Sequence, residues 1–427
     1  MDGAVTPPSE TTGVARQRFS AFAALYHRDY RLYWTGQLVS VTGTWLQQVA
    51  LSWLVLELTR SAFLLGLVGT VQFLPVLLFS LYGGILADRV PKKSLIIATQ
   101  TGMMLVAFLL GLLVASGRVR YWEVLSCAAL LGLLNAADMP ARQSFIISLV
   151  DRRDLMNALS LHAALFNSAR IAGPALAGLI IGRWGLAACF FLNAASFTVL
   201  LVQLFRIRAS GAVLTSLNAS LGVEIRSVLA YVRRTPGILF PLLLLAELSL
   251  LAINFNVLVP AFIRLTLGKN VGDYGFVLAV QGLGAVAGGL ILAVASRCGP
   301  RRWWLGVGAL TLAGAQVVLG CWPGYYQAVG LLFLAGLGMT TFASTANTLV
   351  QLAVADEFRG RVMSLYVIFF IGTTPVGNFL VGTIAHRWGV PAAFVVGGGA
   401  ALFLGILTAL WWRQVERRGP IFARDAS

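Results

Sequence analysis

The sequence predicts an all-α membrane protein with twelve transmembrane helices in two pseudo-symmetric six-helix bundles. Three observations support this fold class. The 427-residue chain is 58% hydrophobic and 11% charged, with a mean hydropathy of +0.82, whereas soluble domains carry about 25% charged residues. Its apolar residues form long continuous runs, which are typical of spanning helices rather than of short, alternating barrel strands. The two halves of the sequence also resemble each other.

Each apolar run is long enough to cross a bilayer, since a spanning helix needs roughly 20 mostly apolar residues. We expect the spans at residues 32–58, 62–86, 94–116, 122–148, 157–181, 187–206, 237–262, 273–296, 303–322, 326–353, 363–385 and 391–412. The first thirty residues are polar and lack a cleavable signal pattern, so the first span is expected to act as its own anchor.

The longest interior break between spans divides the chain six and six. The predicted units are an N-terminal tail (1–31), a first bundle (32–206), a linker (207–236), a second bundle (237–412) and a C-terminal tail (413–427). Apolar residues recur in the linker at helical spacing, at Leu221, Ile225, Val228, Leu229 and Val232. They predict an amphipathic helix on the inner membrane surface, and a partner-binding helix is the alternative.

An internal repeat relates the halves. A shift of 204 residues aligns GPALAGLIIGRWG (173–185) with GNFLVGTIAHRWG (377–389) and places Gly132 on Gly336. A shift of 205 residues places Gly83 and Gly84 on Gly288 and Gly289. Matches at three depths with nearly one shift indicate a duplication. Two six-span halves related by an axis along the membrane normal are a transporter architecture, with the substrate site between the halves near the midplane.

The formal charge of +16 is spread over the ends of the apolar runs and forms no single patch. It therefore predicts membrane topology and no nucleic-acid partner. If both termini are cytoplasmic, 24 of the 32 Lys and Arg lie on the inner side, seven on the outer side and Arg170 within a span. We expect this orientation in a bacterial inner membrane. The isolated cysteines and histidines predict no metal site or cofactor, and no phosphate-binding or nucleophile motif predicts an enzyme.

A charged loop separates the second and third spans. Residues 83–93 read GGILADRVPKK and resemble the signature loop of the major facilitator superfamily, with matches at Gly84, Leu86, Asp88, Arg89, Lys92 and Lys93. Stretches such as GTWLQQVALSWLVLELTRSAFLLG, DMPARQ and DEFRGRVMSLY resemble its enterobactin-exporter and macrolide-efflux branch. The resemblance covers nearly the whole chain. It implies the major facilitator fold and secondary active efflux of a siderophore, macrolide or other secondary metabolite by alternating access.

The resemblance also implies a cytoplasmic gate in this loop, formed by Gly84, Asp88, Arg89, Lys92 and Lys93. Asp88 would meet the neighbouring bases and the positive N-terminus of span eleven, near residues 360–363, and would latch the halves in the outward-open state. The alternative is an ordinary positive-inside loop, which explains the bases but not the acid.

Polar side chains lie on one helical face in spans one, four, seven and ten, which begin the four groups of three spans. These stripes predict a central substrate cavity lined by Gln37, Ser40, Thr44, Gln47, Asn135, Asn254, Thr341, Ser344, Thr348 and Gln351. The alternative is that these groups join neighbouring helices by hydrogen bonds.

Ionisable groups within spans are costly, so they are functional candidates by default. The candidates for proton coupling are Glu247, Asp138, Arg142 and Arg170. We favour Glu247 as the proton carrier over a structural hydrogen bond, and we expect Asp138 and Arg142 to form a fixed ion pair near the gate.

Span five contains GPALAG, which resembles the G-P-x-x-G-G motif of drug/proton antiporters, with Ala177 replacing a glycine. Gly173, Pro174 and Gly178 predict a helix bend and a thin surface on which the halves rock. A bent packing helix is the alternative.

The sequence therefore predicts a monomeric membrane transporter that exports an amphipathic small molecule in exchange for protons. Two alternatives remain, a proton-coupled nutrient importer and a non-transporting membrane sensor or scaffold.

Overall fold

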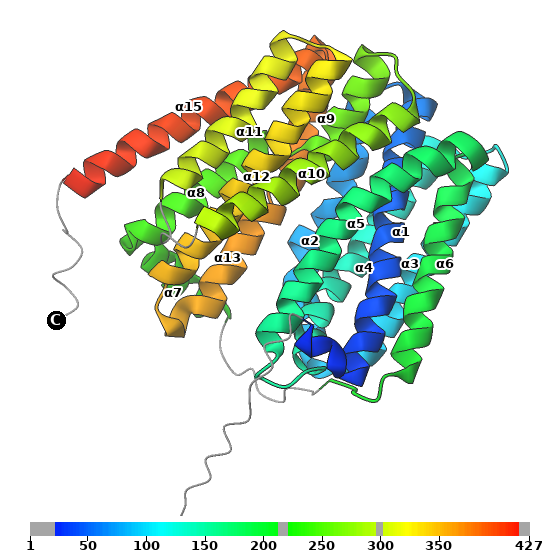
Figure 1. Cartoon of the computed structure of the whole chain (residues 1–427), viewed down its shortest axis with the longest axis horizontal. Helices are drawn as coiled ribbons and strands as arrows, with labels where there is room; N and C mark the ends of the chain where they lie inside the picture. The colour runs from blue at the N-terminus through cyan, green and yellow to red at the C-terminus, as the bar shows by residue number, and fades with distance from the viewer. Residues whose placement is uncertain (1–21, 212–220, 296–301, 418–427) are drawn as a thin grey trace, which may run out of the picture.

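The computed structural model describes residues 22–211, 221–295 and 302–417, and in these ranges every regular element is a helix (Figure 1). Twelve helical segments among the described residues are long and apolar enough to cross a membrane. The predicted fold class is therefore confirmed. The description leaves out the side chains of Leu81, Ile85, Asp88, residues 221–226 and Asp356.

The first half contains six spanning helices and is followed by a shorter helix. They are α1 (Arg28–Thr59), α2 (Ala62–Arg89), α3 (Lys92–Ala115), α4 (Tyr121–Ile147), α5 (Leu155–Trp184), α6 (Leu186–Arg206) and the shorter α7 (Leu221–Arg234).

The second half contains six spans, two of which are built from two helices each. The helices are α8 (Pro236–Leu251), α9 (Phe255–Ala261), α10 (Val271–Ala295), α11 (Trp303–Cys321), α12 (Tyr325–Ala353), α13 (Arg359–Ile371), α14 (Thr374–Trp388) and α15 (Val390–Arg417).

The two broken spans differ from the continuous helices predicted at 237–262 and 363–385. The chain passes from α8 to α9 at residues 252–254, where the Gln316 side chain of α11 donates a hydrogen bond to the Ala252 carbonyl. The chain passes from α13 to α14 just before Pro375. Proline lacks an N–H group and disfavours helical geometry in the preceding residue, so it begins a helix more readily than it continues one.

The two halves repeat the same close helix packing. In α4, a Cβ atom at Gly132 would lie 2.2 Å from the Gln72 carbonyl oxygen of α2, and in α12 a Cβ atom at Gly336 would lie 2.0 Å from the Gln281 carbonyl oxygen of α10. Only glycine permits this approach of two backbones. The predicted repeat that placed Gly132 on Gly336 therefore has a structural counterpart.

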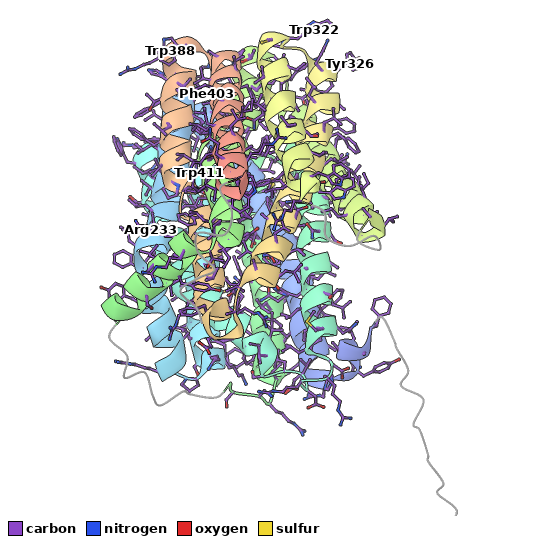
Figure 2. The ribbon with its side chains drawn as sticks, turned by 90° about the vertical axis from the view of Figure 1, so that its left-hand side faces the viewer. Arg233, Trp322, Tyr326, Trp388, Phe403 and Trp411 are labelled. Atoms are coloured by element: carbon purple, nitrogen blue, oxygen red, sulfur yellow. The ribbon has the colours of Figure 1, made fainter. Side chains whose placement is uncertain are left out.

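The molecule has two ends, which we name the Trp388 end and the α7 end (Figure 2). Exposed Trp322, Tyr326 and Trp388 gather at the first, as aromatic side chains do at a membrane interface. The second carries α7 with Arg233. Val228 and Val232 of α7 are buried, so this part of its apolar face packs against protein.

The halves meet mainly near the Trp388 end. A Cβ atom at Gly275 of α10 would lie 2.5 Å from the Pro174 carbonyl oxygen of α5, and the Thr70 hydroxyl of α2 donates to the Pro375 carbonyl of α14 at 2.9 Å. Toward the α7 end the two groups of helices diverge (Figure 1). The space between the halves is therefore closed at the Trp388 end.

Candidate functional site

A cavity of about 170 Å³ lies between the halves, lined by residues of α1, α5, α9, α10 and α12 together with residue 253. Its polar side chains are Gln48, Arg170, Asn256 and Gln281. Apolar and aromatic side chains, including Trp45, Phe255, Tyr274, Leu278 and Met339, form most of the remaining wall. Pockets of this composition, mostly apolar with a few placed polar groups, are typical binding sites for small organic molecules.

A smaller neighbouring pocket shares Gln48 and Asn256 with this cavity and adds Gln72 of α2. The Gln72 amide donates to the Gln48 side-chain oxygen at 3.5 Å, while the Gln72 side-chain oxygen is buried without a protein donor. Buried polar atoms normally have a partner. The amide group therefore has unused capacity to accept a hydrogen bond from water or a ligand.

The cavity lies directly beside the contact that closes the Trp388 end. Pro174 and Gly282 line it, and both belong to the α5–α10 contact, where a Cβ atom at Gly282 would lie 2.7 Å from the Ile171 side chain. On the α1 side, Trp53 stacks on Tyr274 with ring centroids 6.0 Å apart. The same elements thus form the wall of the cavity and the closed end of the molecule.

Of the residues predicted to form a helix bend, Pro174 and Gly178 belong to this contact, whereas Gly173 packs on α1 of the same half. Helix α5 continues through Pro174 without interruption. A Cβ atom at Gly173 would lie 2.4 Å from the Trp45 side chain, and one at Gly178 would lie 3.2 Å from the Gly272 Cα atom. These residues therefore thin the surface of α5 where it meets α1 and α10.

The predicted polar stripe of span one turns mostly away from the cavity. Ser40 is buried, and Gln47 is buried and accepts a hydrogen bond from Asn193 of α6 at 2.7 Å. Thr44 is exposed. The residue of this region that lines the cavity is Gln48, which follows Thr44 by one helical turn and was not among the predicted residues.

The stripe of span four belongs to a buried network. Asp138 is fully buried, and its carboxylate accepts hydrogen bonds from Thr99, Gln100 and Arg142. Arg142 also donates to the Gln37 side-chain oxygen of α1 at 3.1 Å. Asp138 and Arg142 thus form an ion pair that joins α1, α3 and α4. Asn135 bonds within its own helix, to the Leu131 carbonyl.

In span seven, Glu247 lies between α8 and α15. Its Oε1 atom accepts a hydrogen bond from the Thr408 hydroxyl at 2.7 Å, and its Oε2 atom is buried without a partner. Asn254 is buried at the break between α8 and α9, and a Cβ atom at Gly377 of α14 would lie 2.5 Å from its side-chain oxygen. Neither residue lines the cavity described above.

The predicted polar residues of span ten lie on α12, where one is buried and three are exposed. Thr341 is buried beside Gly288 of α10. Ser344, Thr348 and Gln351 are exposed and follow one another toward the α7 end. These three side chains are therefore not buried against other helices, and none of them lines the cavity between the halves.

The bases predicted to form the gate anchor the segment that follows α6. Lys93 donates to the Ile207 carbonyl at 2.7 Å. Lys92 is buried, and Gly211 packs against its side chain. The loop between α2 and α3 is thus tied to the start of the linker within the first half.

The remaining gate positions are less constrained. Arg89 is exposed, and a Cβ atom at Gly84 would meet no atom within 4 Å. The side chain of Asp88 lies outside the described residues. Its contact with the N-terminus of span eleven stays a prediction.

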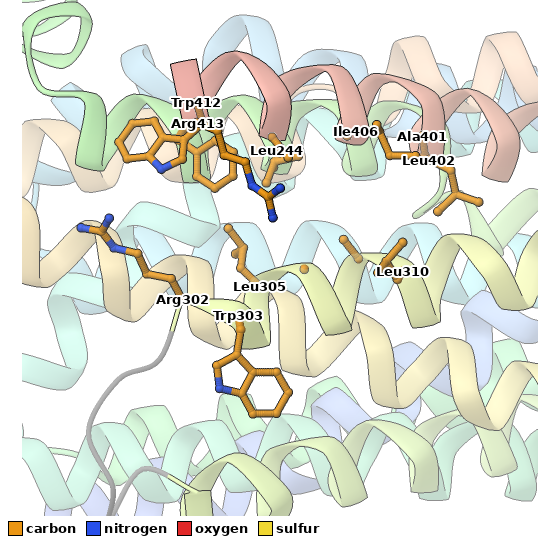
Figure 3. A pocket seen from close by; sticks show the side chains of 15 residues that line it. Leu244, Arg302, Trp303, Leu305, Leu310, Ala401, Leu402, Ile406, Trp412 and Arg413 are labelled. Carbon is orange, nitrogen blue, oxygen red and sulfur yellow. The ribbon is translucent and has the colours of Figure 1, made fainter. Parts of the chain in front are cut away.

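A larger pocket, about 390 Å³ in volume, lies outside the contact between the halves (Figure 3). It is formed by α8, α11 and α15 together with residue 302, and its lining includes apolar side chains such as Leu305 and Ile406 as well as Arg302, Arg413 and Trp412. Because no residue of the first half lines it, this pocket does not supply a path between the halves.

Comparisons with known proteins agree with this architecture. The model of a family described as transmembrane secretion effectors matches residues 19–417. The staphyloferrin A transporter of Staphylococcus aureus is 23% identical over 86% of this chain and 92% of its own. The multidrug efflux pump Tap of Mycolicibacterium fortuitum is 27% identical over 89% and 94%, and macrolide efflux protein A of Streptococcus pyogenes is 24% identical over 88% and 93%.

Solved structures show the same fold. A bacterial homologue of the iron transporter ferroportin, in an inward-facing state, has a TM-score of 0.70 and 16% identity over 90% of this chain and 98% of its own. A peptide transporter in complex with sulfate has a TM-score of 0.72 and 13% identity over 91% and 95%. The chain belongs to the transmembrane secretion effector family, in the efflux branch of the major facilitator superfamily.

Proposed function

We propose that the protein exports an amphipathic small molecule from the bacterial cytoplasm, in exchange for protons, by alternating access to the cavity between the halves. The observation that carries the proposal is the cavity beside the α5–α10 contact, closed at the Trp388 end. The siderophore, multidrug and macrolide substrates named for its relatives support a substrate of this class.

The orientation that fits this function places the α7 end in the cytoplasm. Helix α1 begins and α15 ends at the α7 end. Basic residues concentrate there as well, including Arg89, Arg233 and Arg234. An excess of Lys and Arg on the cytoplasmic side is the general rule for short membrane loops. Substrate then enters from the α7 end and leaves at the Trp388 end.

Alternating access needs contacts between the halves that part and re-form. The α5–α10 and α2–α14 contacts consist largely of glycine against backbone, as at Gly275 and Gly66. Because these contacts carry no ion pair among the described residues, rocking of two rigid halves can open the Trp388 end. The substrate in the cavity then faces the opposite side.

Of the two acids predicted as candidates for proton coupling, Asp138 and Glu247, Glu247 is the better proton carrier. Both carboxylate oxygens of Asp138 already accept hydrogen bonds, and Arg142 neutralises its charge. Glu247 has one oxygen bonded to Thr408 and one buried oxygen without a partner. The free oxygen can accept a proton that arrives and departs during the transport cycle. Because Glu247 lies at the α8–α15 interface, it acts on the cavity through the movement of these helices.

The test measures flux in inside-out membrane vesicles with an acidic lumen. The probe is the carboxamide of dansyl-6-aminohexanoic acid, which is fluorescent and neutral. Wild type should accumulate the probe in the lumen. Glu247→Gln should lose accumulation but retain exchange of probe across the membrane, and Thr408→Val serves as a matched variant that removes only the hydrogen bond.

Other results would favour the alternatives. Proton-driven movement of the probe out of these vesicles would support a nutrient importer. No movement of any kind by the purified, reconstituted protein would support a sensor or scaffold. Unchanged accumulation in Glu247→Gln would reject its role as carrier.

A further inference from the structure

Arg170 of α5 is the one cationic side chain that lines the cavity between the halves. The other polar side chains there are the amides of Gln48, Asn256 and Gln281, and no Asp or Glu lines either this cavity or its smaller neighbour. The wall of the cavity therefore carries a positive charge beside neutral hydrogen-bonding groups.

No carboxylate compensates this charge within the described part of the chain. The ion pairs there are His27–Asp154, Arg28–Asp29 and Arg142–Asp138, and none of the hydrogen bonds between described residues involves the Arg170 guanidinium.

Arg142 provides an internal comparison. It lies in the same half, and its guanidinium contacts the Asp138 carboxylate and the Gln37 side-chain oxygen. The fold thus supplies an acid for one arginine within the membrane and leaves the other facing the cavity with its donors unused. A guanidinium presents five N–H donors in a planar fork that matches a carboxylate in a bidentate pair.

A partly buried charge without a counter-charge is costly, and the cost falls when an anion enters the site. We propose that Arg170 is an anion-binding subsite of the cavity and that the transported molecule carries a carboxylate at one end and an apolar body at the other. The carboxylate pairs with Arg170, and the apolar body packs on side chains such as Phe255, Leu278 and Met339. This inference rests on the proposed function, since it assumes that the cavity holds the substrate.

The position of Arg170 suits a site that binds an anion from one side of the membrane and releases it on the other side. The next residue, Ile171, packs on Gly282 of α10, and Pro174, one turn further along α5 than Arg170, lies against Gly275 of α10. These contacts close the Trp388 end. When they separate, the anion at Arg170 becomes accessible from that end, so the same pairing serves uptake into the cavity and release from it.

The experiment compares three probes that share one scaffold, which are dansyl-6-aminohexanoic acid, its carboxamide and dansylcadaverine. Their charges are negative, neutral and positive. Binding to the purified protein in lipid nanodiscs is measured by dansyl fluorescence, with empty nanodiscs as the blank. A charge-assisted hydrogen bond pair predicts that wild type binds the acid about 10- to 100-fold more tightly than the carboxamide, and the amine most weakly.

Variants at one position isolate the charge. Arg170→Gln should weaken binding of the acid far more than binding of the carboxamide and so reduce the preference for the acid to within about 2-fold. Arg170→Lys should keep part of the preference, since it retains the charge but not the fork. Arg183→Gln, which removes an exposed arginine from the same helix, should behave as wild type. Retained carboxamide binding in each variant shows that the cavity is intact.

Two results would overturn the inference while leaving the proposed function in place. The first is that wild type binds the acid and the carboxamide equally tightly. The second is that both Arg170 variants keep the wild-type preference for the acid. In both cases the carboxamide would still be transported in vesicles. If the reconstituted wild type neither binds nor moves any of the three probes, the proposed export of amphipathic molecules fails, and the assignment of Arg170 fails with it.

Discussion

The ion pair of Asp138 and Arg142 makes a quantitative prediction for the stability of the first half. The carboxylate is fully buried and the arginine side chain is 17% exposed. Asp138→Asn preserves the shape but removes the charge, so the guanidinium stays buried without a counter-charge. Removing one partner of a buried pair costs about 3–5 kcal/mol, whereas removing both charges is often nearly neutral.

Thermal unfolding in detergent, followed by tryptophan fluorescence, measures this cost. For a cooperative unit of 150–250 residues, 1 kcal/mol corresponds to about 2–4 °C in Tm, so Asp138→Asn should lower Tm by roughly 6–20 °C. The double variant Asp138→Asn/Arg142→Gln should recover at least half of that loss. Asp151→Asn, which alters an exposed acid just beyond α4, is the matched control and should unfold like wild type.

Two outcomes would refute the reasoning. The first is a decrease of less than about 2 °C in Asp138→Asn, which would mean that water or structural relaxation compensates Arg142 at little cost. The second is a double variant whose loss equals the sum of the two single losses, since additivity means that the two side chains do not interact.

Two further variants test the contact between the halves and the anchor of the linker. Gly275→Val places side-chain atoms against the Pro174 carbonyl and should shift the molecule toward opening at the Trp388 end. It should raise labelling of a cavity cysteine by a membrane-impermeant maleimide from that side, unlike Gly330→Val, where a Cβ atom meets nothing within 4 Å. Lys93→Met removes the hydrogen bond to the Ile207 carbonyl and should speed limited proteolysis of the segment after α6, with unchanged cleavage arguing against the anchor.

The positions of the spans could be predicted because lipid imposes a simple rule, namely an apolar helix about as long as the bilayer is thick. The breaks in two spans could not, because hydropathy does not register local backbone geometry. Pro375 lies in an apolar run, yet it stands in the first turn of a new helix. The break before α9 depends on a partner from another span, Gln316, which donates to the Ala252 carbonyl.

The cavity was harder to predict than the fold, because successive residues on a helix point about 100° apart. Gln47 fits the polar stripe of span one as well as Gln48 does, but the structure turns the first toward Asn193 and the second toward the cavity. Gln72 and Gln281 carry a signal that the sequence does contain. Each is an isolated glutamine in a long apolar run, and the structure places their backbone carbonyls against the repeated glycines Gly132 and Gly336.

The placement of charge explains why the halves can move as rigid bodies. Within the first half, a hydrogen-bonded ion pair joins three helices, α1, α3 and α4, and pulling them apart would strand a charge in the membrane at a cost of several kcal/mol. Between the halves, the contact consists of close packing around Gly275 and Gly66, stacking of Trp53 on Tyr274 and neutral hydrogen bonds such as that of Thr70. Separating these groups strands no charge in the membrane, and a hydrogen bond between membrane helices contributes only about 0.6–2 kcal/mol. We therefore expect the lowest-energy deformation to part the halves and leave each intact, and the proposed role of Arg170 requires that this motion expose it first to one side and then to the other.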